Sequence, residues 1–532
     1  MTAKIIDTAD VVIVGAGAAG LFTALSLAPK RVIVLSEKPL GGICASCWAQ
    51  GGIAAAVDKD DTTASHAADT LKAAAGTADA EVVRILTAEA PATIKTLEKL
   101  GVRFEHDTDG SFKLSREACH ERRRVLKAAV GDGFGRELMR ALVEVVKNTP
   151  SIVFVEEVAA ERIIRRDGPS TGPVQGVLGR NLKTNTPVVF AAPAVVLATG
   201  GIGGLYAATT NPLGAGGRGI AMAARTGAVL SDLEFVQFHP TALDIGEDPA
   251  PLASEALRGE GAYLLNSRGE RFMLKYHPMA ELAPRDIVSR GIFEQMQRGQ
   301  KVYLDCRHID VTHFPALREA CARANLNPQH NLVPVTPAAH YHMGGIATDL
   351  HGRSSLRGLW ACGEAGATGL HGANRLASNS LMEAVVMGGR VAADIARSKI
   401  LFADAIHINT EALLTLPQKR DREAGKDALR HIMMDMVGVI RDEKTMKDAL
   451  HDIIGIAHGA EKDDTRLADM ALVARMITVS ALQRTESRGG HCRSDYPKAL
   501  RAWEKRSFVT LKEIDALTDR LLTRARQKEG AA

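Results

Sequence analysis

The stretch "DVVIVGAGAAGLFTALSLA", residues 10–28, decides the fold. Residues 11–14 are apolar without interruption, as expected of a buried parallel strand, and residues 21–28 continue as an apolar helix. The glycines between them have GxGxxG spacing, which permits a tight turn, close approach of the backbone to a pyrophosphate and close helix–strand packing. We therefore predict a dinucleotide-binding loop at the N-terminus of the helix. The residues of this loop are Gly15, Ala16, Gly17, Ala18, Ala19 and Gly20.

A second strand and an acidic residue follow in the order that such a site requires. The segment "RVIVLSEK" (31–38) predicts a strand with Glu37 near its end. Glu37 lies about 20 residues beyond the glycines, where an acid binds the hydroxyls of an adenosine ribose. A lone GxGxxG is weak evidence, but strand, glycine turn, helix, strand and acid in this order specifically indicate a Rossmann-like fold.

Two later segments favour a flavin over a nicotinamide dinucleotide. "APAVVLATGGIGG" (192–204) predicts a strand that ends in glycines beside the dinucleotide, and "GLWACGEAG" (358–366) carries Glu364 where a ribityl chain can be hydrogen-bonded. In residues 369–396 we expect Ser380 to be the N-cap of an apolar helix. The backbone N–H groups of Ser380 and Leu381 would then face the flavin ring and stabilise its anionic reduced form. An ordinary capped core helix explains the same pattern.

The composition is that of a multidomain globular enzyme. Of the 532 residues, 46% are hydrophobic and 24% are charged, and no apolar run reaches the roughly 18 residues needed to span a membrane. The net charge is only +4 and no basic patch is interleaved with aromatic residues, so we expect neither nucleic acid nor membrane as a partner. The N-terminus shows no secretory signal. Seven cysteines, an odd number, suit a reducing compartment and predict a cytoplasmic protein.

Several segments together resemble the flavoprotein family of succinate dehydrogenase, fumarate reductase and L-aspartate oxidase, over nearly the whole chain. They are "WAQGGIAAA" (48–56), "EFVQFHPTAL" (234–243), "EALRGEGAYLLN" (255–266), "ELAPRDIVSR" (281–290), "AAHYHMGGI" (338–346), "GLHGANRLASNSLMEAVV" (369–386) and "ESRGGHCRSDYP" (486–497). "HPTAL" and "RLASNSLMEA" are similar to the L-aspartate oxidase branch. The resemblance implies FAD-dependent oxidation of L-aspartate to iminoaspartate, with oxygen (giving hydrogen peroxide) or fumarate as electron acceptor. It also implies a place in de novo NAD biosynthesis, with quinolinate synthase downstream.

The same resemblance assigns further cofactor contacts. Family members in membrane complexes attach FAD covalently through a histidine at the position of Ala45, so we expect FAD to be bound here without a covalent link. Arg218 stands where the family usually has an acidic residue that contacts FAD. The implied cofactor-binding residues are Ala45, Ser46, Cys47, Trp48, Ala49, Gln50, Gly51, Gly52, Glu157, Val158 and Arg218.

A C4 dicarboxylate needs cationic and hydrogen-bonding groups at both ends. The resemblance implies that Arg375, His239 and His340 contact substrate carboxylates. It also implies that Arg285 acts at the substrate carbon. Since arginine normally stays charged, its simpler role is to orient a carboxylate and offset developing charge. Glu117, in "REACH" (116–120) where the family has "REGGH", is expected to bind the substrate ammonium and favour aspartate over succinate. The remaining implied substrate-binding residues are Gln237, Ser254 and Glu255.

Two other functions remain open. A soluble fumarate reductase would share the "HYHMGGI" and "PRD" motifs. A flavin disulfide reductase is suggested by the CxxC pair Cys44 and Cys47, although such enzymes have four residues between their cysteines and a second GxGxxG for NADPH. A zinc site would need a second ligand pair, which is not found nearby at metal spacing.

The predicted fold class is α/β, with a Rossmann-like FAD-binding domain, an inserted α+β capping domain and a C-terminal helical bundle. We expect the FAD-binding domain at 1–232 and 343–411, the capping domain at 233–342 and the helical domain at 412–532. Closure of the capping domain over the substrate would expel water and strengthen charge contacts. In the tail, apolar residues recur with helical spacing. They are Leu429, Ile432, Met433 and Met436, then Met446, Leu450, Ile453 and Ile454, then Leu467, Met470, Ala471 and Ala474.

Overall fold

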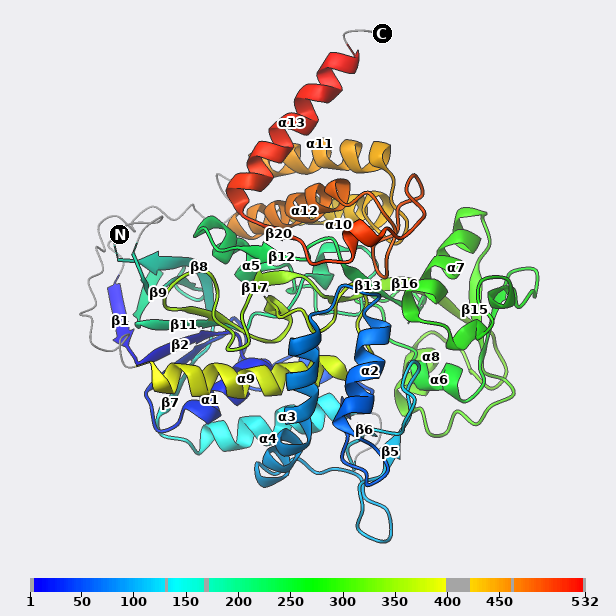
Figure 1. Ribbon diagram of the computed structural model, residues 1–532, viewed down its shortest axis with the longest axis horizontal. Helices are drawn as coiled ribbons and strands as arrows, with labels where there is room; N and C mark the ends of the chain where they lie inside the picture. Colours follow the sequence, from blue (N-terminus) through cyan, green and yellow to red (C-terminus); the bar gives the residue numbers. More distant parts are fainter. Residues whose placement is uncertain (1–3, 130–132, 167–171, 399–421, 461–463, 530–532) are drawn as a thin grey trace.

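The computed structural model describes residues 4–129, 133–166, 172–398, 422–460 and 464–529. It contains a five-stranded parallel sheet, which lies on the left in Figure 1. Its strands, in spatial order, are β18 (Leu359–Ala361), β11 (Ala194–Leu197), β2 (Val11–Val14), β3 (Val32–Leu35) and β7 (Ile152–Val155). The register places Val11 beside both Val32 and Ala194. β2, β3 and β11, which the sequence predicts as strands followed by glycines or an acid, therefore lie next to one another. Their carboxyl ends share one edge of the sheet.

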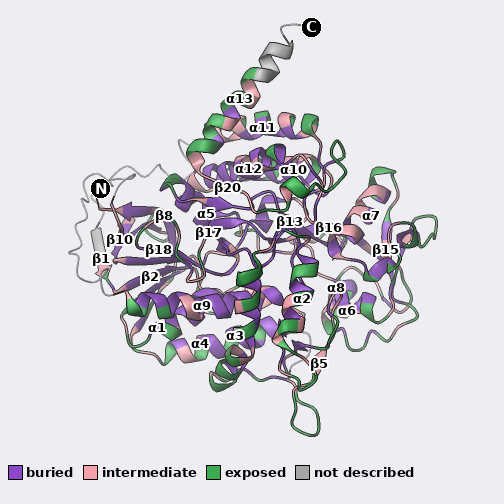
Figure 2. Ribbon diagram, viewed as in Figure 1, coloured by how far each residue is buried: buried purple, intermediate pink, exposed green. Residues whose placement is uncertain are grey.

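Both faces of this sheet are covered, which explains the uninterrupted apolar runs. Val11 and Ile13 belong to the hydrophobic core shared with α1 (Ala18–Leu27), α4 (Phe134–Lys147) and α9 (Asn379–Arg397). Val12 and Val14 belong to a second core on the opposite face, shared with α5 (Arg218–Arg225) and the C-terminal helices. Figure 2 shows α9 as predominantly buried along its length.

One local prediction is wrong: Ser380 is not the N-cap of α9. The helix begins at Asn379, and the residue before it, Ser378, has the left-handed conformation (φ +60°) without a side-chain capping bond. The Ser378 hydroxyl donates instead to the carboxylate of Glu117, 2.8 Å away. Ser380 lies in the first turn, where its hydroxyl accepts a hydrogen bond from Arg375.

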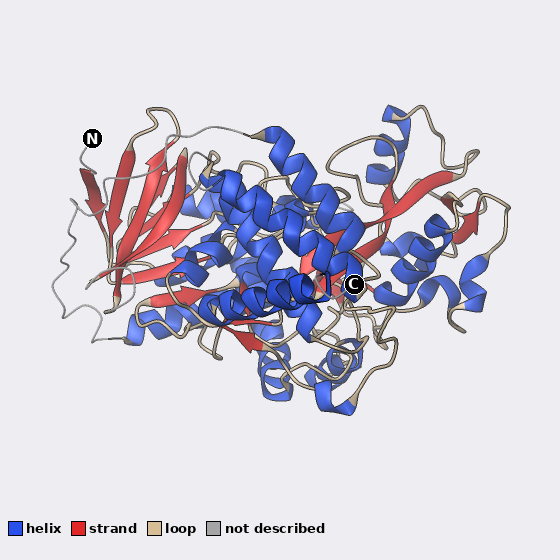
Figure 3. Cartoon of the chain, turned by 90° about the horizontal axis from the view of Figure 1, so that it is seen from above, coloured by secondary structure: helices blue, strands red, loops and turns tan. Residues whose placement is uncertain are grey.

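A second lobe carries an antiparallel sheet and short helices, and lies at the opposite end of the molecule from the N-terminal strands (Figure 3). Its elements pack around a hydrophobic core of their own that spans residues 243–335, within the region predicted as the capping domain. The strands are β13 (Val236–Leu243), β16 (Val333–His342), β15 (Val302–Asp305) and β14 (Tyr263–Asn266), and the helices are α6 (Glu255–Gly259), α7 (Arg285–Gln297) and α8 (Pro315–Arg323).

The C-terminal region is a helical bundle, as the periodicity predicts. Its helices are α10 (Glu423–Met436), α11 (Glu443–Ala460), α12 (Thr465–Gln483) and the projecting α13 (Leu511–Glu529) (Figure 1). The predicted stripes are buried, apart from Ile432, Met436 and Ile454, which pack on the core while partly exposed. The tail also holds a strand that the sequence did not reveal: β20 (Phe508–Val509) pairs antiparallel with β12 (Leu230–Ser231). The boundary predicted at 411/412 lies outside the described residues.

The remaining elements lie outside the five-stranded sheet and the second lobe. None of the described helices is long and apolar enough to cross a membrane. The elements are β1 (Lys4–Thr8), β8 (Val158–Arg165), β9 (Val174–Asn181) and β10 (Pro187–Ala191) in one sheet, β4 (Ile53–Ala54), β5 (Leu114–Ser115) and β6 (Val125–Leu126) in another, β17 (Gly345–Ala347) and β19 (Gly366–Ala367) beside β12, and helices α2 (Thr63–Ala73) and α3 (Ala80–Lys99).

Candidate functional site

A cavity of about 1120 Å³ runs from the glycine loop after β2 to the second lobe. It exceeds the roughly 300–1,000 Å³ of pockets for drug-sized ligands, so it has room for a dinucleotide and a small acid together. Most of the predicted site residues line it. They are Gly15, Ala16, Gly17, Ala18, Ala19, Glu37, Ala45, Ser46, Trp48, Ala49, Gln50, Gly51, Gly52, Glu117, Val158, Arg218, His239, Ser254, Glu255, Arg285, His340, Glu364, Arg375, Ser380 and Leu381.

The glycine loop is shaped as a dinucleotide cradle. Gly15 has φ +111°, and a Cβ there would lie 2.2 Å from the carbonyl oxygen of Ala198. A Cβ on Gly20 would lie 2.0 Å from the Gly15 carbonyl oxygen. These two positions need glycine, and the tight packing that results brings the N-terminus of α1 to the cavity. A helix N-terminus is suited to a pyrophosphate, so the cradle fits FAD.

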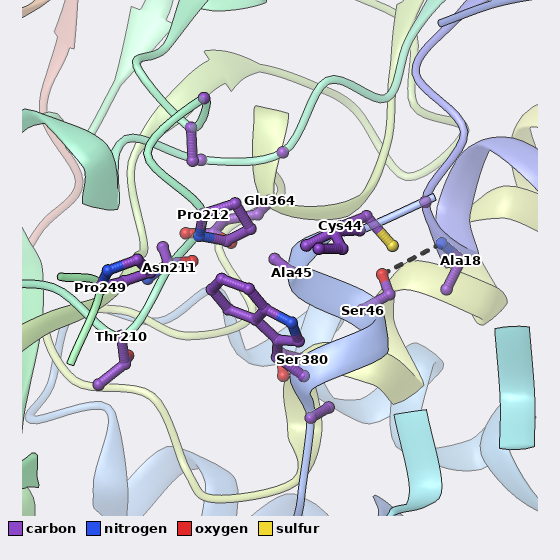
Figure 4. A pocket seen from close by; sticks show the side chains of 18 of the residues that line it. Ala18, Cys44, Ala45, Ser46, Thr210, Asn211, Pro212, Pro249, Glu364 and Ser380 are labelled. Carbon is purple, nitrogen blue, oxygen red and sulfur yellow. Dashed lines mark hydrogen bonds between the residues drawn. The ribbon is translucent and has the colours of Figure 1, made fainter. Parts of the chain in front are cut away.

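The loop that carries Ala45 lies against the start of α1. It forms a 3₁₀ turn, η1 (Ala45–Trp48), and the Ser46 hydroxyl accepts a hydrogen bond of 3.1 Å from the backbone N–H of Ala18 (Figure 4). Ala45 lines the cavity with no nucleophilic side chain. The geometry therefore agrees with a flavin that lies against this loop without a covalent bond.

Glu37 reaches the cavity, but two arginines hold its carboxylate. Arg218 Nη1 lies 3.1 Å from Glu37 Oε1, and Arg466 Nη2 from α12 lies 3.0 Å from Oε2. Arg218 also pairs with Asp469 of the same helix, at 3.3 Å. The departure at Arg218 thus links the expected ribose-binding acid to the C-terminal bundle, and Arg466 joins the cavity lining.

Glu364 lines the cavity beside the glycine-rich end of β11, where its Oε1 would lie 2.0 Å from a Cβ on Gly201. Its Oε1 accepts a 2.9 Å hydrogen bond from the backbone N–H of His342. Burial raises the pKa of this carboxyl to about 7, against the opposing effect of that hydrogen bond. A carboxyl with a pKa near 7 can accept a hydrogen bond from a hydroxyl or donate one to it.

At the other end of the cavity, Glu255 lies between two buried arginines. Arg285 donates to Glu255 Oε2 through Nε (2.9 Å) and Nη2 (2.6 Å), and Arg258 Nη2 lies 3.2 Å from Oε1. Burial alone would raise the pKa of Glu255, but Arg285 and Arg258 outweigh it and hold the pKa below its usual range. These hydrogen bonds fix the position of Arg285. Because one carboxylate faces two guanidinium groups, Glu255 does not neutralise the charge of Arg285 completely.

Two histidines face each other beside this cluster. The rings of His239 and His340 have centroids 5.1 Å apart in an edge-to-face arrangement. Burial and the nearby charge of Arg285 lower the pKa of both well below its ordinary value, so both rings are neutral at pH 7. The Thr241 backbone N–H donates to His239 Nδ1, which leaves the proton on Nε2. His340 Nδ1 lies 2.8 Å from the Thr210 hydroxyl.

Arg375 is the least satisfied charged group of the site. It is 5% exposed, and its Nε has no hydrogen-bond partner among the described residues. Nη1 donates to the Ser380 hydroxyl at 3.3 Å, and the guanidinium lies 4.8 Å from the centre of the Tyr341 ring. Burial and then Arg285 lower the pKa of Arg375 to about 10. An under-bonded buried guanidinium that faces a cavity is ready for an anionic ligand.

Glu117 supplies a carboxylate to the same cavity. It is held by the Ser378 hydroxyl at 2.8 Å, and its Oε1 would lie 2.6 Å from a Cβ on Gly51. Cys119, in the place of a family glycine, has φ +67°, a conformation that glycine adopts more readily. The altered "REACH" loop therefore still brings Glu117 to the flavin-binding loop.

Four predicted residues do not line the cavity: Gly20, Cys47, Glu157 and Gln237. Gln237 instead joins two of the residues that do. Its Oε1 accepts from Arg285 (3.1 Å) and its Nε2 donates to the Arg375 carbonyl oxygen (2.9 Å). The Glu157 carboxylate pairs with Lys183 on the surface, and Gly20 acts through packing.

Sequence reasoning missed several partners. Thr210 bonds His340, Ser378 bonds Glu117, Arg258 shares Glu255, and Arg466 bonds Glu37. Arg258 and Ser378 lie inside motifs already quoted, so the motifs could have pointed to them. Thr210 and Arg466 lie outside these motifs, and no local pattern distinguishes them.

Comparisons with known proteins give a consistent result. The family model described as "FAD binding domain" matches residues 10–381, and "Fumarate reductase flavoprotein C-term" matches residues 460–521. An L-aspartate oxidase of Caulobacter vibrioides is 46% identical over 507 residues, which cover 94% of this chain and 96% of the relative. An L-aspartate oxidase of Xylella fastidiosa is 43% identical over 99% of both chains.

Solved structures agree at the level of fold. An E. coli quinol fumarate reductase superimposes with a TM-score of 0.87 and 29% identity, over 96% of this chain and 95% of that chain. Mycobacterium smegmatis Sdh1 gives a TM-score of 0.82 and 30% identity, over 93% of this chain and 90% of that one.

Proposed function

Because this chain belongs to the L-aspartate oxidase family of FAD-dependent flavoproteins, we propose that it oxidises L-aspartate to iminoaspartate, with oxygen or fumarate as electron acceptor. The observation that carries the proposal is the position of Glu117. Its carboxylate lines the same cavity as Arg285 and Arg375, so one site offers cations for two carboxylates and an anion for an ammonium group. Succinate and fumarate have no ammonium that would need it.

The chain's residues bind and orient the substrate. Arg375, whose guanidinium lines the cavity, binds one carboxylate, and the neutral His239 donates its Nε2–H to a substrate oxygen. Arg285, held by Glu255, orients the second carboxylate and offsets charge at the reacting carbon. When bound, FAD supplies the hydride acceptor and the route for electrons to the final oxidant. Water is excluded by the second lobe, which we propose to be a capping domain at 233–342.

The cofactor contacts proposed here follow the cavity lining. The glycine loop would hold the pyrophosphate, Glu37 the ribose, Glu364 the ribityl chain, and the Ser380–Leu381 backbone the flavin ring. Ala45 supports non-covalent attachment. Val158 lines the cavity and can contribute through its backbone.

The direct test is an anaerobic titration of the flavin absorbance of the purified holoenzyme, first with L-aspartate and then with succinate. We expect bleaching by L-aspartate. Loss of the flavin absorbance with succinate but not with L-aspartate would contradict the proposal.

A second candidate is a soluble fumarate reductase, favoured by the fold shared with quinol fumarate reductase. Comparing aspartate-driven with fumarate-driven turnover separates the two, since a reductase would reduce fumarate with an artificial donor faster than it oxidises L-aspartate.

We further propose a cytoplasmic location, based on the odd number of cysteines, and quinolinate synthase as the enzyme that consumes the product.

A further inference from the structure

The cysteines of the flavin-binding loop are placed as a reactive pair. Cys44 is the residue before η1 and Cys47 is its third residue, and their Sγ atoms lie 3.1 Å apart. Residues three apart eclipse one another in a 3₁₀ turn, and the Cys47 backbone N–H donates to the Cys44 carbonyl oxygen at 3.0 Å. Closing the gap to a disulfide bond requires a movement of only about 1 Å.

The two thiols have different surroundings. Either thiol can donate to the other sulfur. When Cys44 donates to a Cys47 thiolate, this hydrogen bond lowers the pKa of Cys47 to about 6 and raises that of Cys44. Both side chains are half-buried, and Cys44 lines the cofactor cavity. By contrast, Cys306, Cys321 and Cys362 are buried. An accessible thiolate next to a second thiol is the arrangement found in oxidation-sensitive cysteines.

We propose that Cys44 and Cys47 form an oxidisable dithiol that peroxide converts to an intramolecular disulfide on the flavin-binding loop. The Cys47 thiolate attacks peroxide, the O–O bond breaks and hydroxide leaves, which gives a sulfenic acid on Cys47. The Cys44 sulfur then attacks Cys47 Sγ, the S–S bond forms and water leaves. In sum, two thiols and one hydrogen peroxide give one disulfide and two waters. Two molecules of an added thiol, or one added dithiol, return the pair to two thiols by thiol–disulfide exchange and are themselves oxidised to a disulfide.

The position of the pair couples its state to the cofactor. The hydroxyl of Ser46, between the two cysteines, accepts a hydrogen bond from the backbone N–H of Ala18 at the start of α1. On the other side, Ser46 packs so closely on Gly135 that a Cβ there would lie 1.9 Å from the Ser46 carbonyl oxygen. The turn therefore has no room to move away. Drawing the sulfurs together therefore strains a turn that lines the FAD cavity. We expect the disulfide form to bind FAD more weakly. Hydrogen peroxide as an internal oxidant rests on the proposed function, because it is the product when oxygen accepts the electrons.

The test uses reduced, FAD-loaded protein treated with added hydrogen peroxide in the absence of L-aspartate, so it does not depend on the proposed activity. Thiols are then trapped and the peptides analysed by mass spectrometry. We expect the peptide with both cysteines to lose two hydrogens and to recover them with dithiothreitol, while Cys362 stays reduced. In Cys44→Ser, dimedone should trap a sulfenic acid on Cys47, and Cys47→Ser should react about tenfold more slowly.

Persistence of both thiols at peroxide concentrations that oxidise exposed cysteines overturns the proposal, as does direct overoxidation of Cys47 without a disulfide. A FAD dissociation constant that rises about threefold or more on oxidation in the unmodified chain, but not in the double serine variant, supports the coupling; an unchanged constant refutes it. Turnover of L-aspartate in air is a separate arm. A disulfide formed by added peroxide but not by turnover supports the dithiol and counts against oxygen as the electron acceptor of the proposed function.

Discussion

Replacing Arg375 by methionine should have opposite effects on stability and on substrate binding, because the charge of Arg375 is poorly compensated in the ligand-free protein. Burial is the main cause that lowers the pKa of its guanidinium from the usual arginine range to about 10. At about 1.4 kcal/mol for each tenfold change in the proton equilibrium, the fold disfavours the charged form by about 3 kcal/mol. The bond to Ser380 returns about 1 kcal/mol, and the contact with Tyr341 about the same. We therefore expect the methionine variant to be more stable by about 1 kcal/mol.

Activity should move in the opposite direction. Two charge-assisted hydrogen bonds to a substrate carboxylate contribute about 1.5–3 kcal/mol each, so kcat/KM should fall by roughly 100-fold or more. The assays are urea unfolding at fixed FAD concentration and stopped-flow flavin reduction by L-aspartate. A matched control is Arg484→Met, since Arg484 is equally buried but paired with Glu234 and Glu486. Loss of that buried pairing should cost about 3–5 kcal/mol.

Two results would refute the reasoning. If Arg375→Met lowers the urea midpoint as much as Arg484→Met does, Arg375 is a structural residue whose charge the fold satisfies. If the variant keeps kcat/KM within about threefold of the original, the substrate carboxylate does not bind there.

Three further predictions concern single residues of the cavity. Glu117→Gln should raise the KM for L-aspartate about tenfold or more, through loss of a charge-assisted contact, with inhibition by succinate unchanged; equal effects on both ligands would remove Glu117 from the ammonium site. Arg285→Leu should lower turnover at least about 100-fold because substrate orientation is lost and Glu255 keeps only Arg258, and full turnover would overturn its assignment. Glu364 titrates near pH 7 when folded, above its ordinary 4.5, so the FAD-free fold binds more protons than the unfolded chain and loses stability as pH rises between these values. Glu364→Gln should abolish about 1–2 kcal/mol of that loss between pH 5 and 8, after allowance for partial exposure. The same change of the urea midpoint with pH in the variant and the unmodified protein would contradict this.

The sequence predicted the elements whose burial is complete. Val11–Val14 and Ala194–Leu197 are covered on both faces, so their residue type alone specifies a central strand. The start of α9 was misplaced because two serines compete for it. Choosing between Ser378 and Ser380 depends on Glu117, 261 residues away from Ser378 in the chain, and local capping preferences contain no information about such a partner.

Long-range ion pairs were unpredictable for the same reason. Arg466 and Glu37 are 429 residues apart. The sequence around an arginine in the first turn of a helix does not show whether its side chain meets a carboxylate. The exchange of an acid for Arg218 looked like the loss of a cofactor contact, yet it gains Glu37 and Asp469 as partners. A substitution at a site can be interpreted only with the groups that surround it.

Charge balance in the cavity explains how one scaffold distinguishes related acids. Arg285 and Arg375 line the cavity, and the fully buried Arg258 meets it only through Glu255. Together the three arginines carry three positive charges against the one negative charge of Glu255, so this cluster has an excess of two. That excess matches the two carboxylates of any C4 dicarboxylate, and the neutral histidines add donors without adding charge. The arginines therefore cannot distinguish aspartate from succinate. The carboxylate of Glu117 adds a negative charge, and its hydrogen bond to Ser378 fixes where that charge lies. Under the proposed function, the preference for an amino acid over succinate therefore depends on Glu117 as Ser378 positions it.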